Sequence, residues 1–214
     1  MTIVHHNIYS NLQAMSQWAE VGQRGRTELE EAVRIGFSHA FQAMVYEFYP
    51  LLSQLKLPQG QCTLGLRFAS NSELFIEQYL DAPIENYLPQ AESRRTIAEL
   101  GNLHSTYRRA TVSHFIVVTM ALLSSQVRFL AFTGTEQVRQ LMSSLEIPIC
   151  ELSKAEPRRV TTAHHYGRYY QANPKACVVD LTAAMKVINR NHLFTQIVNQ
   201  FHPHIEHLEQ GFSL

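Results

Sequence analysis

The chain has few cysteines and no excess of charge of either sign. Its 214 residues include only Cys62, Cys150 and Cys177, which are too few and too widely spaced for a disulfide framework. Its 18 basic residues are balanced by 18 acidic ones, so no basic field marks it as a nucleic-acid-binding protein. We therefore expect a reducing compartment and no nucleic-acid partner.

Long apolar runs are also absent, and the first residues do not resemble a secretory signal. The sequence opens MTIVHHNIYSNLQ, which has neither a basic n-region nor an apolar h-region. The longest apolar run, at 115–123, is interrupted by Thr119. At ~1.5 Å of helical rise per residue it covers less than half of a bilayer core. These features predict a cytoplasmic protein without a transmembrane segment.

The spacings typical of metal sites and of hydrolase nucleophiles are missing. The 11 histidines include two clusters, His164-His165 and His202-x-His204-x-x-His207. Neither has the His-Glu-x-x-His spacing that places two ligands on one face of a helix. No Gly-x-Ser-x-Gly elbow or Cys-His signature is present. We expect no metal ion and no lipid hydrolase.

Hydrophobic periodicity predicts one domain, with an N-terminal arm at 1–25, a core at 26–183 and a helical tail at 184–214. Apolar residues recur at helical spacing as far as Val45, which predicts a first helix with Thr27 as its N-cap. The segment 73–79 fits either a short helix or an extended segment. The predicted strands are 62–69, 96–103, 127–133, 149–152 and 177–181. The further predicted helices are 108–125, 136–145 and one or two within 182–210. Such alternation requires crossovers and hence an α/β fold with a central mixed sheet flanked by helices.

Five sequence blocks carry a resemblance to a known family. They are GLRFAS (65–70), LFIEQYLDAPIE (74–85), TIAELGNLHS (96–105), FLAFTGT (129–135) and YGRYYQANPKACVVDL (166–181). In this order they resemble the thermostable hemolysin family, a bacterial group with a fold like that of the GNAT N-acyltransferases, over roughly residues 26–183. The fold implies chemistry on acyl thioesters and the family name implies cell lysis, so the site must decide between them.

The GNAT resemblance implies that an acyl thioester lies between two strands that separate at a bulge. A glycine inside a strand is typical of such a bulge, although close packing is another reason for one. Main-chain N–H groups at the start of the following helix would then point at the donor, with arginine charges beside them. The donor-binding candidates are Gly101, Leu103, Ser105, Arg108 and Arg109.

The segment between this strand and this helix departs from the pattern of coenzyme A-binding members. These carry Gln/Arg-x-x-Gly-x-Gly/Ala, whereas 105–110 reads STYRRA and contains no glycine. Acyl carrier protein is therefore favoured over coenzyme A, as a co-substrate rather than a permanently bound cofactor. The chain is also similar to the acyl-homoserine-lactone synthases in the order Gly-x-Arg (65–67) and Glu-x-x-x (99–102), with Asn102 in place of their usual arginine.

Glu99 is the first candidate for the general base, because the acceptor amine must lose a proton and a desolvated carboxylate can have its pKa raised. Arg67 would act beside it, or the two residues form a structural ion pair. His104 is the second candidate, since imidazole titrates near neutrality, unless it is a surface or core histidine. A main-chain N–H near Asn102 or Leu103 would polarise the thioester carbonyl.

Acidic and aromatic residues are the candidates for acceptor binding. Glu77, Asp81 and Glu85 are spaced by four, so on a helix they would share a face able to hold a cationic acceptor. A solvated acidic face is the alternative. Tyr169 and Tyr170 are candidates for a pocket wall or for a core cluster.

These observations together predict an N-acyltransferase that moves a fatty acyl group from an acyl carrier protein or coenzyme A thioester to a small amine. One alternative is a membrane-active hemolysin that lyses cells directly, or indirectly through an acylated amphiphilic product. Another is a GNAT-like shell that binds acyl carriers without catalysis. Open sheet edges and the tail also permit a homodimer.

Overall fold

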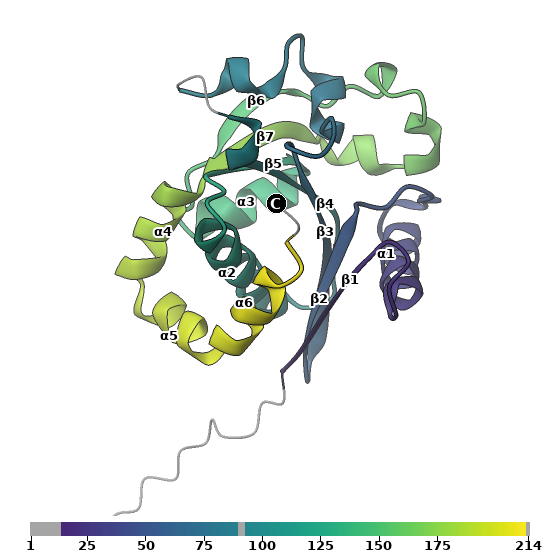
Figure 1. Cartoon of the computed structure of the whole chain (residues 1–214). Coiled ribbons are helices and arrows are strands. Elements are labelled where there is room, and N and C mark those ends of the chain that lie inside the picture. Colours follow the sequence, from purple (N-terminus) through teal and green to yellow (C-terminus); the bar gives the residue numbers. More distant parts are fainter. Residues whose placement is uncertain (1–13, 90–92, 213–214) are drawn as a thin grey trace, which may run out of the picture.

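The computed structural model describes residues 14–89 and 93–212, which form a seven-stranded sheet with helices on both faces (Figure 1). The strands are β1 (Met15–Glu20), β2 (Leu51–Leu57), β3 (Gly60–Phe68), β4 (Ile97–Ser105), β5 (Phe129–Gly134), β6 (Cys150–Lys154) and β7 (Lys175–Asp180). The helices are α1 (Arg26–Phe41), α2 (Arg108–Ser124), α3 (Glu136–Ser144), α4 (Leu181–Arg190), α5 (His192–Gln200) and α6 (His202–Glu209). Short 3-10 helices are η1 (Phe75–Tyr79), η2 (Ile84–Tyr87), η3 (Arg94–Thr96), η4 (Pro157–Arg159), η5 (Ala163–Tyr166) and η6 (Tyr169–Ala172).

The strands lie in the order β1-β2-β3-β4-β5-β7-β6, and the predicted mixed sheet is confirmed. β1 to β4 are antiparallel neighbours, whereas β4 and β5 are parallel and joined by the crossover helix α2. β7 inserts antiparallel between β5 and β6. The last strand in the sequence therefore lies inside the sheet, and β6 lies at its edge.

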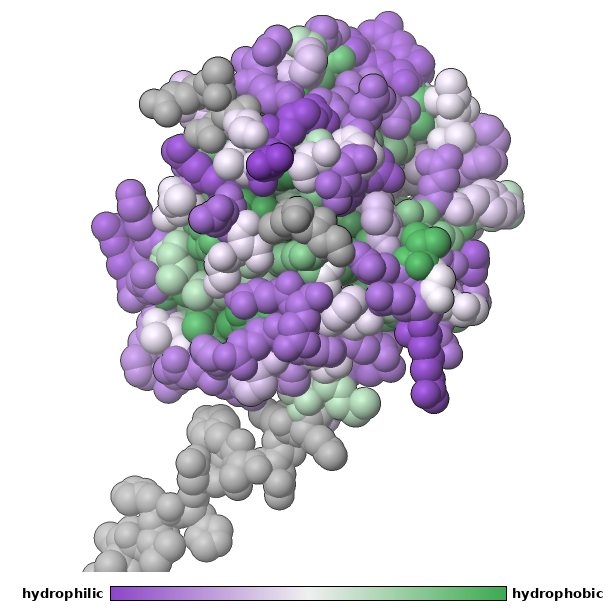
Figure 2. Space-filling model, viewed as in Figure 1, coloured by the Kyte–Doolittle hydropathy of each residue, from purple (hydrophilic) through white to green (hydrophobic). Residues whose placement is uncertain are grey.

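Helix α1 covers one face of the sheet, and α2 packs with α4, α5 and α6 on the other (Figure 1). The middle of α2 is apolar on nearly every side because it is enclosed between the sheet and these C-terminal helices. On the face shown in Figure 2, hydrophilic residues dominate the outer surface, and most of the visible hydrophobic residues lie toward its middle.

The N-terminal part of the chain differs from the prediction. No strand was expected before Thr27, yet Met15–Glu20 pairs with β2, and Trp18 donates a hydrogen bond to the His207 carbonyl of α6 at 2.7 Å. Residues 1–13 of the predicted arm lie outside the described residues. The N-cap of α1 is Gly25, with φ 85°, so the prediction of Thr27 as N-cap is wrong.

Arg26 explains why α1 begins where it does. Its buried guanidinium donates to the carbonyls of Ala19 at 3.2 Å, Pro50 at 2.9 Å and Tyr49 at 2.7 Å. The first turn is thereby tied to the chain entering β2 and to the end of β1. At its other end α1 stops at Phe41, and the segment expected to be helical as far as Val45 has no regular secondary structure.

The tail forms three helices where one or two were predicted. Asp180 caps α4 by accepting from the Thr182 N–H at 2.8 Å, and Asn191 caps α5 by accepting from the Leu193 N–H at 3.0 Å. Pro203 lies in the first turn of α6, where a missing N–H costs no hydrogen bond, so it begins a helix rather than breaking one.

Candidate functional site

Strands β4 and β5 pair over four residues and then part. Their parallel ladder joins 97–100 to 129–132. β4 continues to Ser105 and β5 to Gly134 with no further pairing between them. From Gly101 onward, the side of β4 that faces β5 therefore has no strand partner. Its main-chain N–H and C=O groups can bind an extended ligand there.

β4 carries one extra residue where the two strands part. Gly65 of β3 faces Gly101, whereas Thr63 faces His104, so two steps along β3 match three along β4. Asn102, within this bulge, has a left-handed φ of 48°. The bulge that the sequence predicted at Gly101 is thus confirmed, and bulges bend the strand that carries them.

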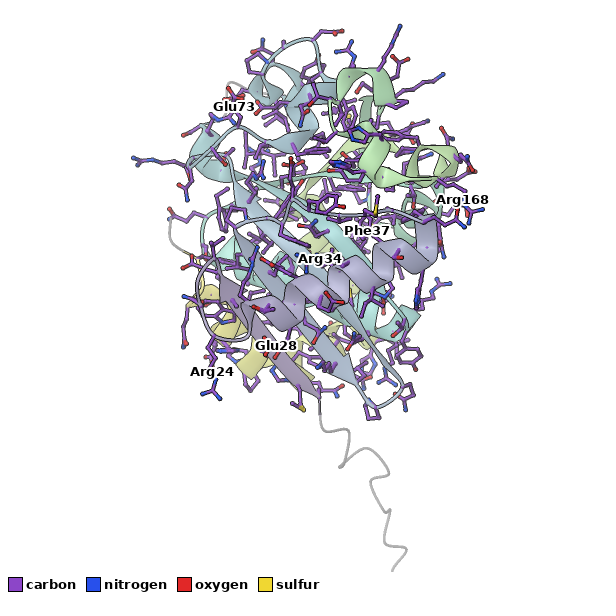
Figure 3. The ribbon with its side chains drawn as sticks, turned by 90° about the vertical axis from the view of Figure 1, so that its right-hand side faces the viewer. Arg24, Glu28, Arg34, Phe37, Glu73 and Arg168 are labelled. Atoms are coloured by element: carbon purple, nitrogen blue, oxygen red, sulfur yellow. The ribbon has the colours of Figure 1, made fainter. Side chains whose placement is uncertain are left out.

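A cavity of about 720 Å³ runs through the gap between β4 and β5 and is lined from both faces of the sheet. On the α1 face its wall includes Gly36, Phe37, Ala40, Phe41, Glu47, Tyr49, Arg67, Phe75, Tyr79, Tyr166, Tyr169 and Tyr170. On the other face the wall is formed by 105–108, Thr111 and residues from 135 to 144. Phe37 lies in the C-terminal part of α1, near the segment that contains Arg168 (Figure 3), and its ring centre is 6.4 Å from that of Tyr169. The volume suits a small-molecule site.

Tyr49 lies on two glycines that face each other across β3 and β4. A Cβ atom on Gly65 would lie 2.7 Å from Tyr49 Cβ, and one on Gly101 would overlap the far end of the ring. The Tyr49 N–H donates to Asn102 Oδ1 at 2.8 Å. The guanidinium carbon of Arg67 is 4.7 Å from the ring centre on the cavity side. The two glycines therefore provide the space in which the Tyr49 ring lies flat on the sheet.

Glu99 is fully buried and does not contribute to the cavity wall. Its two carboxylate oxygens accept from the N–H groups of Phe75 at 2.7 Å and Ile76 at 2.8 Å. Burial raises the pKa of Glu99 to about 7, opposed by the Tyr49 hydroxyl, these two N–H groups and the charge of Arg67. The residue predicted as general base thus lies behind the wall, next to Tyr49, rather than in contact with the cavity.

Arg67 faces Glu99 in the register of β3 and β4, but in the described part of the chain no ion pair joins the two side chains. Its NH1 donates to the Glu73 carbonyl at 3.2 Å, and its buried Nε has no hydrogen-bond partner. The structural ion pair considered from the sequence is therefore not formed. The Arg67 guanidinium instead stacks on the Tyr49 ring, and its N–H donors lie at the cavity wall.

His104 lies on the cavity wall with its ring against Gly36 of α1. Burial, and to a lesser degree the nearby His39, lower the pKa of His104 below its usual value. The imidazole is therefore neutral at pH 7 and able to accept a proton, so its location is compatible with the predicted role.

The donor-binding candidates lie mostly on the other side of the gap. Ser105 Oγ accepts from Thr111 Oγ1 at 2.7 Å and fixes the first turn of α2, while Arg108 donates to Ser144 of α3 at 2.9 Å. The main-chain N–H groups of 108–110 have no acceptor within the described residues. The cavity wall includes Gly101, Leu103, Ser105 and Arg108, whereas Arg109 is exposed and lies outside it.

Tyr169 and Tyr170 do line the cavity. The Tyr169 hydroxyl donates to the Thr133 carbonyl at 2.9 Å, and the Tyr170 and Tyr79 hydroxyls are 3.0 Å apart. We name the aromatic surface that they form with three neighbours the aromatic wall. It consists of Phe75, Tyr79, Tyr166, Tyr169 and Tyr170.

Glu77 and Asp81 lie outside the cavity wall, so their predicted role in acceptor binding is corrected. The segment forms 3-10 helices separated by bends, and a spacing of four therefore does not place these carboxylates on one face. Glu77 accepts from Arg94 at 2.8 Å, and Glu85 pairs with the same arginine at 3.1 Å. Asp81 pairs with Arg159 at 2.5 Å. These contacts fold the loop against the sheet.

Arg94 was not singled out from the sequence, yet it holds this loop through Glu77, Glu85 and the carbonyls of Ala69 and Ser72. We expect Arg94→Met to lower the free energy of unfolding by about 1–3 kcal/mol, because two partly buried carboxylates lose their cation. Urea unfolding at pH 7 measures this loss. Arg158→Met is the control, since its pair with Glu156 is exposed. An equal loss in both variants would contradict the role of Arg94.

In 14–89 and 93–212, no three His, Cys, Asp or Glu side chains converge as metal ligands would. His164 and His165 place their ring centres 4.0 Å apart, and His202 lies 3.6 Å from Glu206. No helix of the described chain is long and apolar enough to cross a bilayer.

Comparisons with known proteins agree with this geometry. A family model described as thermostable hemolysin matches residues 19–185. The crystal structure of the AHL synthase LasI is similar with a TM-score of 0.54 and 10% identity, covering 80% of this chain and 91% of LasI. FeeM, an N-acyl amino acid synthase from uncultured soil microbes, is similar with a TM-score of 0.57 and 13% identity, covering 86% and 98%. A search of curated proteins found no match.

Proposed function

The chain belongs to the thermostable hemolysin family, and we propose that it transfers an acyl group from a thioester to an amine nitrogen. The observation that carries this proposal is the gap between β4 and β5, where an unpaired strand edge, a bulge and a cavity coincide. The two amides of a pantetheine arm have the donors and acceptors to pair with that edge as an added strand would. The shared fold with LasI and FeeM, whose names describe synthases of acylated products, supports the proposal.

The donor enters from the side of α2 and α3 in this proposal. There 108–110 present three free main-chain N–H groups at a helix N-terminus, which suits a phosphate. The thioester carbonyl then lies at the bulge, where a main-chain N–H of Asn102 or Leu103 serves as oxyanion donor. The acceptor approaches from the α1 side, over the aromatic wall.

The acceptor that this side fits best is an amine that also carries a carboxylate, such as an amino acid. Arg67 offers guanidinium donors that no carboxylate of the described chain occupies, and guanidinium pairs well with carboxylate. The aromatic wall suits an apolar or aromatic side chain. The name of FeeM, an N-acyl amino acid synthase, supports this class of acceptor.

Product analysis tests the proposed activity. Purified protein is incubated with a long-chain acyl carrier protein or acyl-coenzyme A and a mixture of the common amino acids and simple amines. Mass spectrometry should then detect N-acyl products that require both the protein and the donor. Release of free fatty acid alone, with no amide formed from either donor, would contradict acyl transfer.

We expect the carrier-protein donor to show the higher kcat/KM, because the glycine-free segment at 105–110 offers little main chain for a nucleotide pyrophosphate. Arg108→Glu/Arg109→Glu should reduce kcat/KM for this donor at least about tenfold at low salt, since basic residues steer an acidic partner. Lys186→Glu/Arg190→Glu on exposed positions of α4 is the control with the same change of net charge. The segment does not select the donor if acyl-coenzyme A has an equal or higher kcat/KM and Arg108→Glu/Arg109→Glu reduces kcat/KM for both donors alike.

Hemolysis is the second candidate function, and the name of the matching family is the observation that favours it. An acyltransferase reaches this outcome through its product, because an acylated amino acid is an amphiphile that disrupts bilayers. Erythrocytes should then lyse with the reaction mixture, and not with protein freed of lipid and donor. Lysis by the lipid-free protein alone would assign the activity to the protein itself.

A further inference from the structure

We propose that Tyr49 is a catalytic residue of this site, whose hydroxyl takes the proton of the attacking amine while passing its own proton to Glu99. The inference rests on the acyl transfer proposed above and adds the group that removes the proton. Tyr49 lies on the cavity wall and Glu99 does not. Glu99 and Gly101 are two residues apart on β4 and so share a face of the sheet, and the Tyr49 hydroxyl lies over Gly101. The hydroxyl therefore lies between the cavity and a carboxylate that substrate does not touch.

The hydroxyl of Tyr49 lies where the reaction would take place. A Cβ atom on Gly101 would be 2.7 Å from the Tyr49 hydroxyl oxygen. Gly101 is the first residue of β4 beyond its pairing with β5, and it precedes the bulge. A thioester bound to this strand edge therefore presents its carbonyl close to the hydroxyl. Such proximity is the first requirement for a general base.

Hydrogen bonds to both main-chain polar groups of Tyr49 fix its position. Its N–H donates to Asn102 Oδ1 at 2.8 Å, and its carbonyl accepts from Arg26 at 2.7 Å. Asn102 Nδ2 also donates to the Glu47 carbonyl at 3.3 Å. Tyr49 is only 7% exposed, and its ring lies between the two glycines and Arg67. The side chain is therefore held in one orientation before substrate binds, as a catalytic group requires.

The charges around the pair favour proton transfer to Glu99 over a lasting tyrosinate. Burial, followed by the charge of Glu99, raises the pKa of Tyr49 well above its usual range, with Tyr166 adding to and Arg67 opposing the shift. Burial raises the pKa of Glu99 to about 7, and its neighbours are Tyr49, Arg67 and the two N–H groups of η1. Tyr49 must therefore give up its own proton as it takes one. The ionised carboxylate able to receive it exists mainly above pH 7.

The step balances without any further reactant. The lone pair of the neutral amine attacks the thioester carbonyl carbon, a C–N bond forms, and an amine proton passes to the Tyr49 oxygen as the Tyr49 proton passes to Glu99. The C–S bond then breaks with its electron pair on sulfur. The proton on Glu99 returns through Tyr49 to the thiolate, which gives the amide, a free thiol and the original form of both residues.

The test compares Tyr49→Phe with the wild type, because phenylalanine keeps the ring on the two glycines and removes only the hydroxyl. We expect kcat to fall by about 10²–10³-fold, with KM for donor and acceptor nearly unchanged. The wild-type rate should fall as pH decreases through about 7, where Glu99 becomes protonated, and this limb should be absent in Tyr49→Phe. The amine of the acceptor titrates alike in both proteins, so the difference belongs to the protein.

A second measurement does not depend on turnover. Carbon-13 NMR of labelled glutamate should show one carboxyl group titrating near pH 7, absent in Glu99→Gln, and it should titrate higher in Tyr49→Phe, because the hydroxyl favours the carboxylate. Tyr46→Phe is the control, since Tyr46 is exposed and outside the cavity wall. Product formation with unchanged kcat and pH profile in Tyr49→Phe would overturn the role of Tyr49 alone. Failure of the wild type to form any amide would overturn the acyl transfer and this role with it.

Discussion

Gly101→Ala should lower turnover by at least about a hundredfold while the chain still folds. A Cβ atom at this position would overlap the end of the Tyr49 ring and lie 2.7 Å from its hydroxyl oxygen. Because Asn102 and Arg26 hold the main chain of Tyr49, the ring itself has to rotate away. The hydroxyl then loses both Glu99 and the substrate edge, which removes general-base assistance of about 10²–10⁴-fold. Overpacking should cost about 1–3 kcal/mol of unfolding free energy.

A double mutant separates the steric from the chemical effect. Tyr49→Ala removes the ring atoms that a new Cβ would meet, so Gly101→Ala should cost little further stability in that background. Turnover should remain low in the double mutant, because no hydroxyl is present. The measurements are urea unfolding and product formation for the two single mutants and the double mutant. Wild-type turnover in Gly101→Ala would show that the ring is not needed over this glycine.

The central strands and helices were predictable because their periods are pronounced. Alternation through 62–68 identified β3, and the nearly continuous apolar stretch after Arg108 identified α2. β1 was not predicted because Met15–Glu20 mixes polar and apolar residues, and its place at the sheet edge depends on contacts with β2, α1 and α6. The starts of α4 and α5 are set by the caps Asp180 and Asn191, and Pro203 lies in the first turn of α6, which a continuous apolar stripe does not reveal.

The site was predictable where one strand carried it and not where the fold brought distant segments together. Gly101, Asn102 and His104 lie within four residues of β4, so their common location could be predicted from the sequence. That Arg67 faces Glu99 depends on the register of β3 and β4, which spacing does not determine. Tyr49 was missed because it belongs to no motif. The register that pairs Gly65 with Gly101 shows why these two positions lack side chains, since the Tyr49 ring occupies the space above them.

The burial of Glu99 could not be predicted from the sequence. A carboxylate on β4 was expected to contact substrate, but the Glu99 oxygens accept from the N–H groups of Phe75 and Ile76 behind the cavity wall. A sequence pattern can single out a carboxylate and still not show which side chain lies between it and the cavity. The proton route through Tyr49 follows only from knowing which side chains reach the cavity.

Arg67→Met should make the protein nearly indifferent to the carboxylate of its acceptor. In the wild type we expect an amino acid to be acylated with a kcat/KM about 10–100-fold higher than the amine that lacks only the carboxylate, the usual value of a charge-assisted hydrogen bond. The expectation rests on the Arg67 guanidinium, which pairs with no carboxylate in the described chain and has a buried Nε without a partner. Methionine keeps the apolar stem over the Tyr49 ring and removes the charge.

Two readouts distinguish acceptor binding by Arg67 from support of the Tyr49–Glu99 pair. Loss of kcat/KM for the amino acid alone, with the decarboxylated amine unaffected at pH 9, assigns the guanidinium to the acceptor carboxylate. The charge of Arg67 also lowers the pKa of Glu99, so Arg67→Met should move the acid limb of the rate profile above pH 7 for both acceptors. The ratio of kcat/KM between the two acceptors within one protein is free of this shift, because the shift affects both acceptors alike. An equal loss for both acceptors would show that Arg67 does not bind the acceptor carboxylate.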